Sequence, residues 1–151
     1  MPFDDVTNSS SGPRLVSLSR DECLVLLASN DLGRIGVVDA QGPSIFPVSY
    51  QLLVVDGDPV IAIRTRAGGV IDRRGAAVSF EIDGLDIGHD GGWSVLIRGV
   101  LEPIELDNEL DQGSLLPQDH DAWRAIVPSE ITGRRLLAGP VRWTFDPHGY
   151  L

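Results

Sequence analysis

The chain has 151 residues, 42% of them hydrophobic and 23% charged, with a formal net charge of -10. This length and composition predict one soluble domain with a real core. The acidic balance argues against a protein that binds nucleic acid or anionic membranes through a basic face. All twelve basic residues are arginines, so the chain has no lysine for Schiff-base chemistry or phosphate contacts.

The beginning of the chain predicts a tail followed by a helix. Residues 1–13 are polar and acidic and contain no apolar segment, so we expect a flexible tail before one domain over residues 14–151, and neither a signal peptide nor a membrane helix. Ser19 and Glu22 form a capping-box pattern, which predicts a helix to about Ala28. Cys23 lies on its apolar stripe, which favours a buried small hydrophobe over a nucleophile. A single cysteine excludes an intrachain disulfide and fits a reducing cytoplasm.

Short strands separated by turns are expected after the helix. The strands are predicted at Arg34–Val38, Ile45–Val55, Val60–Arg64, Ala77–Asp83, Trp93–Glu105 and Val141–Asp146. Asp56-Gly57-Asp58 has the composition of a hairpin turn. One helical turn is expected at Gly68–Arg74 and one helix around Asp119–Ile126. Several strands with few helices favour a mainly β protein built as a small antiparallel barrel.

Four of the twelve arginines lie between residues 64 and 74, at Arg64, Arg66, Arg73 and Arg74. The segment follows an apolar strand and contains the Gly68-Gly69 pair. Guanidinium groups match the geometry of phosphate oxygens, and a glycine turn can add backbone N–H donors. The segment therefore suits an anionic ligand such as a phosphate. A solvated loop whose arginines pair with nearby acids explains the same pattern.

Other catalytic patterns are weak or missing. The sequence has no nucleophile elbow, no phosphate-binding P-loop and no dinucleotide-binding glycine motif. The three histidines, His89, His120 and His148, are far apart and lack metal-ligand spacing, so no metal site is expected. Trp93 begins a long strand after two glycines, where its indole suits either the pocket of a flat aromatic ligand or the core.

Several segments, taken in order, resemble one known family. They are Leu32 to Val38, Pro43 to Tyr50, Ile63-Arg64-Thr65, Val78 to Asp83, Gly92 to Gly99 and Ile131 to Leu136. Their order and spacing are similar to the pyridoxamine 5'-phosphate oxidase-like, FMN-binding split-barrel proteins, in particular the small actinobacterial-type branch. The resemblance implies a six-stranded antiparallel split β-barrel with a few short flanking helices. It also implies a homodimer that holds FMN in a groove between its subunits.

The resemblance also implies roles for individual residues. Pro47, Val48 and Ser49 would contact the isoalloxazine ring, and Arg64 and Thr65 would approach the phosphate. The following turn would close over the phosphate, and Trp93 would lie near the pocket rim. Val70 stands where the family commonly has a lysine, and Arg66, Arg73 or Arg74 could replace the missing charge. Ser49 stands where an asparagine is frequent.

Two functions are compatible with this pattern. The first is a flavin-dependent oxidoreductase that uses FMN, or a deazaflavin instead, on a small-molecule substrate, in which the cofactor supplies the redox chemistry. The second is a non-catalytic flavin-binding or other ligand-binding protein on the same fold, which has lost its activity or cofactor. Pyridoxamine phosphate oxidation itself is not favoured, because the sequence shows no clear second basic set for the substrate phosphate.

Overall fold

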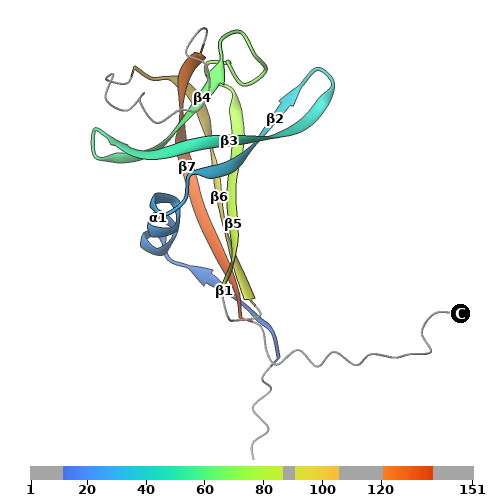
Figure 1. The fold of residues 1–151 in the computed structure, drawn as a ribbon, viewed down its shortest axis with the longest axis vertical. Coiled ribbons are helices and arrows are strands. Elements are labelled where there is room, and N and C mark those ends of the chain that lie inside the picture. Colours follow the sequence, from blue (N-terminus) through green and yellow to red (C-terminus); the bar gives the residue numbers. More distant parts are fainter. Residues whose placement is uncertain (1–11, 87–90, 106–120, 138–151) are drawn as a thin grey trace, which may run out of the picture.

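The computed structural model describes residues 12–86, 91–105 and 121–137. These residues form seven strands and one helix. In chain order they are β1 (Arg14–Leu18), α1 (Arg20–Ala28), β2 (Leu32–Asp39), β3 (Gly42–Val55), β4 (Asp58–Arg66), β5 (Ala77–Asp86), β6 (Gly91–Pro103) and β7 (Asp121–Leu137). Strands β5, β6 and β7 run along the length of the molecule, and β2 and β3 cross them (Figure 1).

Hydrogen bonding closes six of the strands into a ring. The strand order is β7-β4-β3-β2-β5-β6, and β6 pairs again with β7. One edge of β7 carries β4 along residues 121–126 and β1 along residues 133–137. All of these pairings are antiparallel. The mainly β, antiparallel barrel-like architecture expected from the sequence is confirmed.

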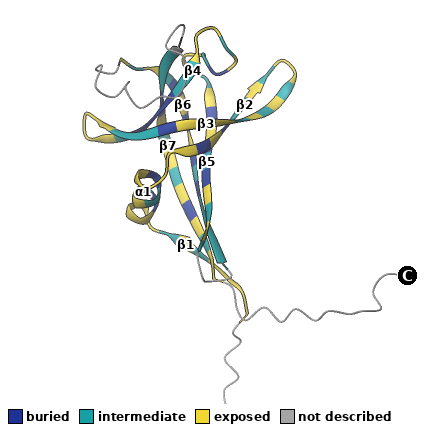
Figure 2. Cartoon of the chain, viewed as in Figure 1, coloured by how far each residue is buried: buried dark blue, intermediate teal, exposed yellow. Residues whose placement is uncertain are grey.

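The core lies inside this ring and is filled by side chains from the inner faces of the strands, while on β4 four consecutive residues are buried, Val60, Ile61, Ala62 and Ile63. On β5, Val78, Phe80 and Ile82 are buried while Ser79 between them is exposed, as expected where successive side chains point to opposite faces. Strands β4 and β6 contribute further fully buried aliphatic residues, including Ile61, Ile63, Val95, Ile97 and Leu101. In Figure 2 the buried positions alternate with exposed ones along the long strands.

The predicted helix forms with the predicted cap. The Ser19 side chain accepts from the backbone N–H of Glu22, and the Glu22 carboxylate accepts from the Ser19 N–H at 2.7 Å. The hydrogen bond from the Ser19 backbone N–H, and next the contribution of the Ser19 side chain, lower the pKa of the Glu22 carboxyl. Cys23 is fully buried, as expected, and burial raises the pKa of its thiol. The buried Tyr50 hydroxyl donates to the Leu27 carbonyl at 2.7 Å and so ties α1 to β3.

Two local expectations are wrong. Residues 121–126, expected in a helix, begin the long strand β7, because pairing with both β4 and β6 overrides the local preference. The segment expected to form a helical turn at Gly68–Arg74 makes successive tight turns, with Gly69 N–H on Arg66 O and Asp72 N–H on Gly69 O. The positive φ of Gly68, 75°, is incompatible with a right-handed helix. The strand expected at Val141–Asp146 lies outside the described residues.

Candidate functional site

The candidate site begins where β3 and β4 stop pairing. The last pair in the register is Tyr50 with Ile63, and both side chains are buried in the core. The next residues outward, Ser49 and Arg64, therefore face the opposite, outer side of the barrel on neighbouring strands. Ser49 is exposed and Arg64 is half-buried. A hydroxyl and a guanidinium thus share one outer face at this end of the barrel.

Alternation assigns the neighbouring residues to the two faces. Pro47 and Arg66 share the outer face with Ser49 and Arg64, and both are exposed. Val48 is only 8% exposed and belongs to the core cluster. A ligand on the outer face would therefore reach Val48 only through its backbone. Thr65, which is half-buried, lies on the same inward side as Val48.

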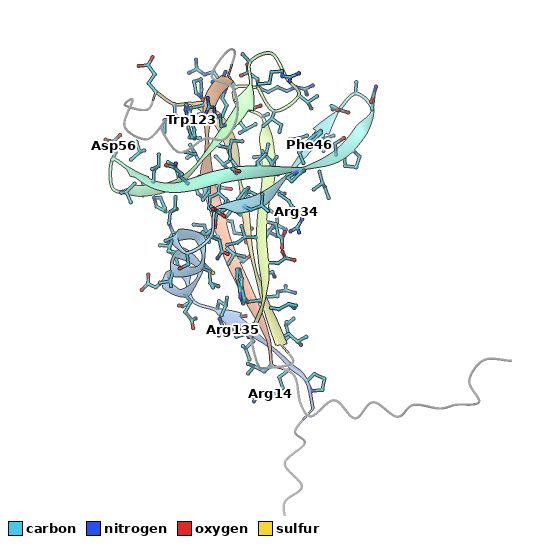
Figure 3. The ribbon with its side chains drawn as sticks, in the orientation of Figure 1. Arg14, Arg34, Phe46, Asp56, Trp123 and Arg135 are labelled. Carbon is cyan, nitrogen blue, oxygen red and sulfur yellow. The ribbon has the colours of Figure 1, made fainter. Side chains whose placement is uncertain are left out.

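Strand β7 adds an aromatic side chain to the outer face. Trp123 lies directly across from Arg64 in the β4–β7 register, so the two side chains share a face. Figure 3 labels Trp123 at the upper end of the barrel, close to the turn that joins β4 to β5. The half-buried indole offers a flat apolar surface beside the Arg64 guanidinium.

The turn between β4 and β5 uses its glycine N–H groups internally. Gly68 N–H donates to Asp72 Oδ2 at 2.7 Å, and Gly69 N–H donates to Arg66 O at 3.0 Å. The sequence pattern suggested that such groups could bind a phosphate. Because both are already hydrogen-bonded in the turn, arginine side chains are the donors that this segment presents to an anion.

The arginines of the turn differ in their surroundings. Arg66 and Arg73 are exposed, and no acid in the described part of the chain pairs with either of them. Arg74 is also exposed, but its Nε lies 3.4 Å from Glu102 Oε2. Val70, at the position where a lysine was expected from the resemblance, is 40% exposed. Arg66 and Arg73 are therefore the side chains of the turn best placed to take an anion.

Beneath the turn, Asp72 pairs with Arg124 of β7. This ion pair is mostly buried, with 15% of the Asp72 side chain and 18% of the Arg124 side chain exposed. Arg124 also donates to the Trp123 carbonyl at 2.7 Å. The Gly68 N–H and then the Arg124 guanidinium lower the pKa of Asp72. Asp72 is thus held as a carboxylate by groups on two different segments.

Trp93 lies at the other end of the long strands. It pairs with Arg135 of β7, whereas Arg124, next to the turn, lies opposite Pro103. Ten residues of β6 therefore separate Trp93 from this end, which corresponds to about 33 Å at about 3.3 Å per residue. Its indole covers Gly84, where a Cβ atom would come within 2.5 Å of the ring. Within one subunit the structure does not bring Trp93 to the turn between β4 and β5.

The sequence reasoning missed Asp72, Trp123 and Arg124 as members of this site. The expected helix over residues 119–126 hid the last two, because it gave no reason to place them beside β4. The apolar run Ala125-Ile126-Val127 with its β-branched residues was the available signal for a strand.

Neither a metal-binding cluster nor a membrane-spanning helix is found among the described residues. No group of three or more His, Cys, Asp or Glu side chains within residues 12–86, 91–105 and 121–137 is placed to hold a metal ion. The three histidines lie outside this set. No helix in the described part of the chain is long and apolar enough to cross a membrane.

Comparison with known proteins agrees with the fold. The family model described as pyridoxamine 5'-phosphate oxidase matches residues 19–135. An uncharacterized protein of Mycobacterium tuberculosis is 34% identical over 143 residues, which cover 85% of this chain and 90% of that protein.

Two solved structures are also similar. One, described as the FAD binding protein from Mycobacterium smegmatis, has 31% identity and a TM-score of 0.60, and the match covers 81% of this chain and 98% of that one. Another, from Corynebacterium glutamicum, has 30% identity and a TM-score of 0.62, with 83% and 95% of the two chains covered. The chain therefore belongs to the pyridoxamine 5'-phosphate oxidase-like family of split-barrel proteins.

Proposed function

We propose that the chain binds a flavin nucleotide, FMN in the first instance, on the outer face of β3 and β4 and beside the turn that follows. The observation that carries this proposal is the set of arginines at one end of the barrel. Arg64 and Arg66 lie on one strand face, and Arg73 is exposed on the turn. Family membership supports the proposal, as does the similar structure described as FAD binding.

The residues present fit such a ligand. Guanidinium groups offer paired donors to a phosphate, which compensates for the glycine N–H groups used inside the turn. Ser49 and Pro47 lie on the same outer face and could contact the polar edge and the plane of a ring system. Bound flavin would supply hydride transfer, and the chain would bind and orient it. On this basis we propose an oxidoreductase acting on a small-molecule substrate in the cytoplasm.

We also propose that the working unit is a homodimer. Val38 and Ile45 are 71% and 72% exposed, and together with Val100 they line a shallow depression of about 490 Å³ across β2, β3, β5 and β6. Exposed aliphatic groups gathered on one sheet face favour a protein partner. A sedimentation run in which micromolar protein stays at 16.3 kDa would overturn the dimer.

A second candidate function is a flavin-binding protein without catalytic activity. Val70 favours it, because an aliphatic side chain at this position leaves the turn with one cation fewer than the family pattern. Such a protein would bind the nucleotide more weakly and serve as a carrier or sensor.

Titration with ligands tests both candidates. The purified chain is mixed separately with FMN, FAD, riboflavin and a deazaflavin, and binding is followed by the quenching of ligand fluorescence. A reduced nicotinamide is then added without oxygen. Binding followed by loss of the flavin's yellow absorbance supports the oxidoreductase, and binding without reduction by any reductant supports the carrier. If no flavin or deazaflavin binds, the proposal is wrong in both forms.

A further inference from the structure

Asp72 lies within the turn between β4 and β5 and links parts of it by hydrogen bonds. Its Oδ2 accepts from Gly68 N–H at 2.7 Å, four residues earlier in the turn, and its other oxygen pairs with Arg124 of β7. One carboxylate thus joins the start of the turn to its middle and to the barrel wall. The preceding residue, Ile71, is buried in the core, and Val70, one residue earlier, is exposed.

The turn is fastened at its far end as well. Gly75 N–H donates to Leu101 O of β6 at 2.7 Å, and Leu101 N–H donates to Ala76 O at 2.9 Å. The segment that carries Arg73 is therefore fixed between Asp72 and Gly75. Arg66 is fixed at the other end, because its carbonyl accepts from Gly69 N–H.

The direction of Arg124 separates its role from that of the other arginines. Arg124 lies opposite Ile63, whose side chain is in the core, so it faces inward, whereas Arg64 faces outward. Pairing Asp72 with this inward arginine neutralises the carboxylate beneath the turn. An unpaired carboxylate there would repel a phosphate, and it would compete for the outward arginines.

We propose that Asp72 and Arg124 form a latch that positions the turn so that Arg66 and Arg73 meet the phosphate of the flavin nucleotide. This inference rests on the proposed function and deepens it. Both are positioning residues, since they act through the turn and not by touching the ligand. In this proposal the latch fixes the turn before the ligand binds.

Comparing FMN with riboflavin tests the latch, because riboflavin has the same ring and no phosphate. In Asp72→Asn we expect FMN to bind about tenfold more weakly, the effect of losing one charge-assisted hydrogen bond. Riboflavin has no phosphate for the turn to hold, so its affinity should change less than about twofold. If Asp72 had a purely structural role, the substitution would instead lower the affinities for FMN and riboflavin alike.

Asp39→Asn is the matched control. Asp39 also accepts a turn N–H, from Gln41 at 2.8 Å, but it lies in the hairpin between β2 and β3. This variant should bind FMN like the wild type. Arg124→Lys keeps the charge and removes the guanidinium fork, so it should show a smaller loss confined to FMN. If the thermal unfolding curve of Asp72→Asn shows that this variant does not fold, Arg124→Lys still tests the latch.

The outcomes separate the latch from the proposed function. Equal losses for FMN and riboflavin, or unchanged FMN binding in both latch variants, would overturn the latch while flavin binding by the wild type stands. If the wild type binds neither ligand, the proposed function is wrong and the latch falls with it.

Discussion

Replacing Val70 with lysine adds a cation to the turn that already carries Arg66 and Arg73. Val70 is 40% exposed, and the lysine stem can cover much of the surface that valine covers now. The substitution should therefore change the free energy of unfolding by less than about 1 kcal/mol, since fully burying a valine contributes only about 1.5–3 kcal/mol. The protein should stay folded, so a change in affinity can be assigned to the added charge.

A well-placed ammonium group on phosphate contributes about 1.5–3 kcal/mol, which corresponds to a gain in FMN affinity of about ten- to a hundredfold. The gain should shrink as salt rises, because added ions screen the contact. The existing arginines reduce the gain where they already satisfy the phosphate oxygens. Fluorescence titration with FMN and with riboflavin at low and high salt measures each effect, and riboflavin affinity should not change.

Val25→Lys is the control for the added charge. Val25 is 64% exposed on α1, and the substitution changes the net charge by the same amount. Equal gains in both variants would mean that the effect is a general one of net charge. No gain in Val70→Lys, with weak FMN binding by the wild type, would refute the reasoning that this position lies over the phosphate.

Two further predictions concern the scaffold that holds the site. Gly84→Ala should lower the melting temperature, because its Cβ would come within 2.5 Å of the Trp93 ring, and overpacking of this kind costs about 1–3 kcal/mol; an unchanged thermal unfolding curve would contradict the packing described. Burial, and next the nearby charge of Asp31, raises the pKa of Tyr50 to about 12. A group with a raised folded pKa stabilises the fold below its unfolded value, near 10, and that contribution is lost as pH rises toward 12, at about 1.4 kcal/mol per pH unit. Chemical unfolding at several alkaline pH values should show this slope in the wild type and a flatter one in Tyr50→Phe; equal slopes would contradict it.

Five strands of the barrel, β2 to β6, were predictable from the pattern of their apolar residues. Alternation of Val78, Phe80 and Ile82 with polar residues marks β5 without ambiguity, and the Ser19–Glu22 pattern marks the start of α1. These are local signals, since each depends on the chemistry of a few neighbouring residues. They indicate which segments form strands, and the resemblance supplied the way in which the strands close into a ring.

Strand β7 could not be predicted in the same way. It contains Pro128 and Gly133, which ordinarily interrupt strands. In the structure Pro128 lies opposite Gly99, where the pairing of β6 with β7 shifts its register. The proline, which has no backbone N–H, therefore lies at an irregularity of the ladder. This accommodation depends on the partner strand and is invisible in the β7 sequence alone.

The candidate site was predicted in part. The arginine cluster and its position after a strand were visible, and the structure places Arg64 and Arg66 on one face. The Asp72–Arg124 pair was not visible, because it joins residues 52 positions apart through a strand that had been read as a helix. The distance of Trp93 from the turn also depends on register, which a single sequence does not reveal.

Comparing FMN binding by Arg64→Ala and Arg14→Ala tests the central claim most directly. Both variants lose one arginine, but Arg14 lies opposite Leu137, whereas Arg64 lies opposite Trp123, about 45 Å away along β7 at about 3.3 Å per residue. The account predicts a loss of about ten- to a hundredfold in FMN affinity for Arg64→Ala and none for Arg14→Ala. Equal affinities for the two variants would contradict the assignment of the phosphate to this end of the barrel.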